Sequence, residues 1–109
     1  MARLAAGFWV AAYRARLEAE GIPCAVVARG DADAGAVLVK CATMDGAASV
    51  HHRTWDLATG DRVWAVLAEG PEAACDAAVA RQRGFDPDLW VLEVEDPRGR
   101  HMLGEAGLE

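Results

Sequence analysis

The chain has 109 residues, of which 53% are hydrophobic and 26% charged, and its 17 acidic and 11 basic side chains give a formal net charge of −6. This length predicts a single domain over residues 1–109 with room for one core. The negative charge argues against a nucleic-acid partner, because phosphate groups are bound by basic surfaces. No apolar run approaches the ~18 residues of a membrane span, so we expect no membrane association either.

Residues 3–20 are predicted to form a helix, because Leu, Ala, Arg and Glu dominate the stretch and Gly21 and Pro23 follow it. The helix carries two apolar stripes, although one is enough to cover a sheet. The second stripe therefore needs another partner, either more of this chain or a second subunit, and the latter would form a homo-oligomer through this helix. The stripes are Leu4, Phe8, Ala11 and Ala15 on one side and Ala6, Val10, Tyr13 and Leu17 on the other.

Four strands are predicted to follow as a meander. The turn formers at 30–35 predict a hairpin between the first two strands, and Asp45-Gly46 predicts a two-residue hairpin turn between the next two. Residues 58–61 predict the last turn of the meander. The expected strands cover residues 24–29, 36–43, 48–56 and 62–69.

Residues 70–95 predict a second helix, a turn and a fifth strand. Gly70 suits the N-cap and Pro71 the first helical position, where its missing N–H costs nothing. Gly84 offers a left-handed stop for the helix. The strand is expected over residues 89–94, without an assigned neighbour, and Met102 and Leu103 are expected to dock in the segment after it.

Several of the predicted strands are apolar on both faces, which indicates a sheet that is covered on both sides. With two helices available, we predict an α+β fold with a single mixed, mostly antiparallel sheet of about five strands. A helix on each face would make it a three-layer α-β-α sandwich. The link from the fourth strand through the second helix to the fifth is expected to be a crossover.

The Asp45-Gly46 turn also predicts a register for its hairpin. A two-residue turn places Lys40 opposite His51 and Leu38 opposite Arg53. Directly opposed residues share a face of the sheet. Three basic side chains, Lys40, His51 and Arg53, are therefore expected on one face.

This basic cluster, with Trp55 at its border, is the candidate binding site. Charge-assisted hydrogen bonds could hold a small anionic ligand there, through a phosphate or a carboxylate group, and Trp55 offers a stacking plane. The alternative is an ordinary ion-pair network, because Glu93 and Glu95 share a face of the last strand and could neutralise the cluster. Among the four tryptophans, Trp9 and Trp55 are expected to be partly exposed, as interface residues often are.

Cys24, Cys41 and His52 share the other face in this register. They form the alternative hypothesis, a small enzyme or a metal- or thiol-dependent domain. The ligand spacing typical of zinc is absent, and buried thiols commonly pack as small apolar side chains, so no metal site is predicted. Three widely spaced cysteines fit reduced thiols in the cytoplasm. The pattern assigns no catalytic residue and no cofactor.

Four strings of the sequence resemble a small bacterial family that is catalogued as a domain of unknown function, number 1491. They are FWVAAYRARL, GDADAGAVLVK, WDLATGDRVWAVLAEGPE and RGFDPDLWVLEVED. The resemblance extends over essentially the whole chain and implies a compact cytoplasmic bacterial domain, but it brings no activity, cofactor or site residue. From the residues themselves, the expected function is a non-enzymatic binding or interaction module.

Overall fold

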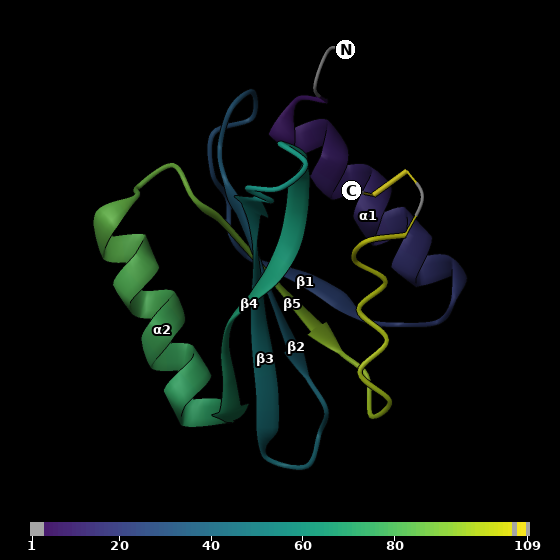
Figure 1. Ribbon diagram of the computed structural model, residues 1–109. Helices are drawn as coiled ribbons and strands as arrows, with labels where there is room; N and C mark the ends of the chain where they lie inside the picture. Colours follow the sequence, from purple (N-terminus) through teal and green to yellow (C-terminus); the bar gives the residue numbers. More distant parts are fainter. Residues whose placement is uncertain (1–3, 106, 109) are drawn as a thin grey trace.

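The computed structural model describes residues 4–105, 107 and 108. It consists of two helices and a single mixed sheet of five strands (Figure 1), which confirms the predicted α+β class. Helix α2 begins one residue later than expected and runs through Gly84. In chain order the elements are α1 (Ala6–Ala19), β1 (Cys24–Ala28), β2 (Val37–Ala42), β3 (Ala47–Trp55), β4 (Arg62–Pro71), α2 (Glu72–Phe85) and β5 (Trp90–Glu95).

The strand order is β1-β5-β2-β3-β4, so the predicted hairpin between the first two strands is wrong. Strand β5 lies between them, antiparallel to β1 and parallel to β2. The reason lies in the loop at residues 30–36, which wraps around the start of β5. The Asp31 N–H donates to the Asp88 carbonyl (3.0 Å), and the Trp90 indole N–H donates back to the Asp31 carbonyl (2.7 Å).

Each helix contributes to its own core cluster, and Figure 1 shows α1 and α2 on opposite sides of the sheet. Only one stripe of α1 packs on the sheet. Trp9, predicted to be partly exposed, is only 3% exposed, because it packs within the α1 cluster. The principal members of the α1 cluster are Trp9, Val10, Tyr13, Leu17, Val39, Cys41, Leu92 and Val94, and those of the α2 cluster are Leu38, Ala48, Val50, Cys75, Leu89 and Val91.

The segment after β5 folds back over the α1 side of the molecule. Met102 and Leu103 pack against the α1 cluster, which confirms their predicted docking. Leu108 is buried in the same cluster. Within the described part of the chain, neither helix has the length and apolar character to cross a membrane.

Candidate functional site

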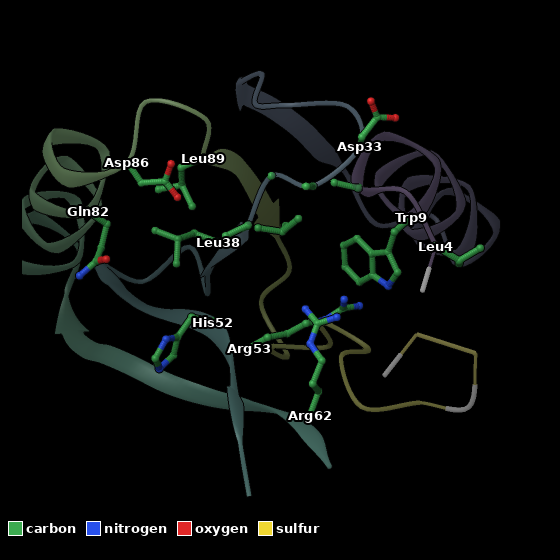
Figure 2. A pocket seen from close by; sticks show the side chains of 15 residues that line it. Leu4, Trp9, Asp33, Leu38, His52, Arg53, Arg62, Gln82, Asp86 and Leu89 are labelled. Atoms are coloured by element: carbon green, nitrogen blue, oxygen red, sulfur yellow. The ribbon is translucent and has the colours of Figure 1, made fainter. Parts of the chain in front are cut away.

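A pocket opens where β2 and β3 diverge. Their ladder ends at the pair Val39 and His51, and beyond it residues 36–38 and the pair His52 and Arg53 line a cavity of about 230 Å³ (Figure 2). Because the strands have separated, side chains from both faces of the sheet reach this cavity. The remaining lining comes from the start of α1, the 33–35 loop, the end of α2 and β4.

The polar side chains that line the pocket are mixed in charge. Arg53 from β3 and Arg62 from β4 lie on the side of Trp9, and His52 lies on the side of α2 (Figure 2). Asp33 and Asp86 bring negative charge to the rim. Two guanidinium groups offer fork-shaped donor sets that suit carboxylate and phosphate oxygens.

Arg53 is held rigidly at the pocket wall. Its guanidinium carbon lies 4.8 Å from the ring centre of Trp9 and 4.8 Å from that of Trp64, so the cation stacks against two indoles. Its Nη2 also donates to the Leu108 carbonyl at 3.5 Å. The arginine therefore presents a fixed donor geometry, which suits recognition of a planar or tetrahedral anion.

The predicted basic cluster does not share one face. The ladder pairs Lys40 with Val50 and Val39 with His51, one residue away from the predicted register. The turn is longer than two residues, because Met44 adopts a positive φ of 65° and Thr43 N–H donates to the Ala47 carbonyl at 3.1 Å. A shift of one residue moves every side chain of a strand to the other face.

Lys40 consequently lies on the α2 face and is 5% exposed. Its ammonium group is 2.8 Å from Glu72, 2.7 Å from Asp76 and 3.1 Å from Glu93. The neutralisation by Glu93, expected as the alternative for this lysine, is therefore present. This arrangement ties α2 to the sheet, and Lys40 does not line the pocket.

The other two members of the predicted site lie apart from the pocket as well. His51 is buried on the α1 face, with its Nε2 2.8 Å from the Ser49 hydroxyl oxygen and its ring tilted against that of His101. Trp55 ends β3 and is 58% exposed, which agrees with its predicted partial exposure. Of the four predicted residues, only Arg53 lines the pocket.

The observed register also separates the three residues of the thiol hypothesis, Cys24, Cys41 and His52. Cys24 and Cys41 flank Val94 in the sheet, on the α1 face, whereas His52 lies one position after His51 and thus on the α2 side. Burial raises the pKa of the Cys24 thiol to about 11 and also raises that of Cys41, so both thiols are protonated at neutral pH. Among the described residues, no group of three or more His, Cys, Asp or Glu side chains could hold a metal ion.

Sequence reasoning missed the assembly of Trp9, Arg53, Trp64 and Leu108. The turn at residues 58–61 carries the signal for part of it. That turn is closed by the Asp56 N–H donating to the Asp61 carbonyl (2.8 Å), and counting back from it places Arg53 opposite Trp64. The contact with Leu108 follows from tertiary packing and has no local signal.

The fold and the pocket thus define a small α+β domain with a mixed sheet and a polar cavity at one end. The model of the family described as a protein of unknown function (DUF1491) matches residues 4–104, and the chain belongs to this family. The expected family membership is confirmed. A comparison with curated proteins found no match.

Solved structures of similar proteins share the fold. The crystal structure of a DUF1491 family protein from Caulobacter crescentus CB15 superimposes with a TM-score of 0.83 at 38% identity, over 94% of each chain. An NMR structure of a DUF1491 family protein from the same organism gives a TM-score of 0.83 at 38% identity, over 96% of each chain. The solution structure of protein Atu0922 from A. tumefaciens, a structural genomics target, gives 0.73 at 28% identity, over 86% of each chain.

Proposed function

We propose that this protein is a non-enzymatic binding module whose pocket accommodates a small anionic group at Arg53. The observation that carries the proposal is the convergence of Arg53, Arg62 and His52 on one cavity of about 230 Å³. The proposal keeps Arg53 from the predicted site and replaces Lys40, His51 and Trp55 by the other two lining bases. The three free cysteines support a reducing, cytoplasmic location.

The ligand class follows from the lining. The two arginines and His52 favour a carboxylate or phosphate on the β3–β4 side, and Gln82 offers an amide to a neutral polar part of the ligand. Leu38 and Leu89 give the cavity an apolar floor. A compact metabolite with one anionic end fits this distribution better than an extended polyanion, because Asp33 and Asp86 would repel a second negative charge.

Replacing Arg62 with glutamine is expected to weaken binding of inorganic phosphate or acetate at least tenfold, because one of two guanidinium groups is lost. Titration followed by NMR chemical shifts measures the change, with the signals of His52 and the Arg53 side chain as reporters. Arg98→Gln removes the same charge from an exposed turn outside the pocket and should leave the affinity unchanged. Shifts confined to residues outside the pocket would contradict the proposal.

We further propose that each chain is a three-layer sandwich of α1, sheet and α2. We also propose that two copies associate through the outer side of α1. The two core clusters support the layers, because each helix packs on its own face of the sheet. The α1 cluster contains the buried stripe of that helix. The second stripe faces outward, with Leu4 55% and Phe8 67% exposed. The small residues Ala11 and Ala15 continue that stripe and permit close approach of the same helix from a second copy.

Replacing Phe8 with glutamate is expected to raise the dissociation constant of the homo-oligomer at least tenfold, because a charge would enter an apolar contact. Sedimentation velocity over a concentration series measures the shift. Phe85→Glu makes the same change at a phenylalanine of α2 that is 81% exposed, and it should leave association unaltered. A wild-type protein that sediments as a monomer at millimolar concentration would contradict the proposal.

A further inference from the structure

A segment without helix or strand lies across the α1 side of the molecule. This strap comprises residues 97–105 together with Gly107 and Leu108, and Figure 1 shows it running alongside α1. It is held by side chains of the core and not by a backbone ladder. Tyr13 donates its hydroxyl hydrogen to the His101 carbonyl at 2.6 Å, and the indoles of Trp9 and Trp64 donate to the Leu108 carbonyl at 3.3 and 3.1 Å.

A pair of histidines forms the contact between the strap and β3. The rings of His51 and His101 are in contact, with their centres 4.3 Å apart and their planes inclined at 48°. The Leu103 N–H donates to Nδ1 of His101 at 3.1 Å, so this nitrogen must carry a lone pair and His101 is neutral in the docked strap. Protonation at Nδ1 would remove that acceptor and place a cation against the buried ring of His51.

The surroundings of the pair offer its protonated form little compensation. Arg62 of β4 lines a second cavity together with both rings, and it brings no negative charge to the pair. Tyr13 of α1 already uses its hydroxyl on the His101 carbonyl. On the flanking strands, Cys41 of β2 and Glu69 of β4 lie opposite Ser49 across the ladders, two residues before His51.

We propose that the strap is a pH-operated latch, docked near neutral pH by the neutral His51–His101 contact and released when the pair is protonated in mildly acidic conditions. The strap's Leu108 carbonyl accepts hydrogen bonds from both Trp9 and Arg53, which line the pocket. Release therefore loosens the pocket wall. This coupling to the pocket rests on the proposed function, whereas the latch itself stands on the strap contacts alone.

The direction and size of the pH effect on strap docking follow from the thermodynamic linkage between docking and protonation. Burial, and then the neighbouring His101, lower the pKa of His51 to about 4, and burial lowers the pKa of His101. A group with a lowered pKa in the docked state contributes stability that is present above its ordinary pKa of about 6.5 and is lost as the pH falls. His51 alone makes the docking constant about 20-fold smaller at pH 5 than at pH 7 if the released strap restores its ordinary pKa.

Amide hydrogen exchange of residues 99–105 in the full chain tests the latch. After correction for intrinsic rates, protection is expected to fall about 20-fold between pH 7 and pH 5 in the wild-type protein. The variant H51F/H101F keeps two aromatic rings that cannot be protonated, and its protection should change less than twofold over this range. Tyr13→Phe should lower protection at both pH values and retain the wild-type pH dependence, since it removes a hydrogen bond to the backbone carbonyl of His101 and leaves both imidazole rings unchanged.

Equal protection at both pH values in the wild-type protein would overturn the latch. If the double variant does not fold, His51→Gln replaces it, and a fall in protection as large as that of the wild type would also overturn the proposal. Phosphate titration of wild type and Tyr13→Phe at pH 7 then tests the coupling, with weaker binding expected in the variant. A strap that responds to pH in a protein that binds no phosphate would support the latch and overturn the pocket function.

Discussion

Replacing Lys40 with methionine is expected to lower the free energy of unfolding by about 3 kcal/mol at pH 7. Lys40 is the single lysine of the sequence and is 5% exposed. Without its ammonium group, the carboxylates of Glu72, Asp76 and Glu93 would face one another across the contact between α2 and the sheet. The cost combines their mutual repulsion with the loss of three charge-assisted hydrogen bonds.

The pH dependence identifies Lys40 as the source of this stability. Burial alone would lower its pKa, but the hydrogen bonds to Asp76, Glu72 and Glu93 outweigh burial and raise the pKa above the ordinary value. A raised pKa in the folded state gives stability that is complete below the unfolded pKa, about 10.4, and is lost as the pH rises through the folded pKa. The difference between wild type and Lys40→Met should therefore stay constant from pH 7 to about pH 9 and shrink at higher pH.

Chemical denaturation of both proteins at a series of pH values measures this difference. Contributions from Cys24, Cys41 and Tyr13 cancel in it, because Lys40 is not among the groups that shift their pKa values. Arg81→Met removes a charge from an exposed position of the same helix and should change stability by less than about 0.5 kcal/mol. Glu93→Gln should cost about 1 kcal/mol, because Lys40 retains two carboxylate partners. A Lys40→Met variant as stable as the wild type would show that these ion pairs are fully offset by desolvation.

Much of the fold was predictable because local signals and global packing agree. The second helix and the strand after it lie within one or two residues of their predicted bounds, and the double stripe of the first helix separated a buried side from an exposed one. The position of β5 was not predictable in this way. Its neighbours are chosen by the 30–36 loop, whose contacts with Asp88 and Trp90 join residues more than 50 positions apart.

The predicted site was wrong because the register between β2 and β3 differs by one residue from the predicted register. Asp45-Gly46 is typical of a two-residue turn, but Met44 joins the loop, and Asp45 accepts hydrogen bonds from the Thr43 hydroxyl and the Ala47 N–H within it. That extra residue sends Lys40 to α2 and His51 to the α1 face. Arg53 lines the pocket in spite of the shifted register, because it lies beyond the last residue pair of β2 and β3. The strands separate there, and side chains from either face of the sheet reach the pocket.

Replacing Gly30 with alanine is expected to destabilise the protein by about 4 kcal/mol, since overpacking and lost hydrogen bonds add together. A Cβ atom at this position would lie 2.2 Å from the Asp88 carbonyl oxygen and 2.7 Å from the Trp90 backbone nitrogen. These atoms belong to backbone, so they cannot rotate away as a flexible side chain would. The 30–36 loop would have to move away from the start of β5, and the hydrogen bond from Asp31 to Asp88 would be lost.

Gly84→Ala provides the matched control, because it makes the same substitution inside α2, where a Cβ atom meets nothing within 4 Å. It should stabilise the protein by about 0.5 kcal/mol, as expected for removal of glycine from a helix. Opposite signs for these two variants in thermal or chemical denaturation would show that the 30–36 loop holds β5 between β1 and β2 through close backbone contact. A Gly30→Ala variant within 1 kcal/mol of the wild type would mean that the loop can withdraw without loss and that the pairing of β5 with β1 and β2 alone fixes its place.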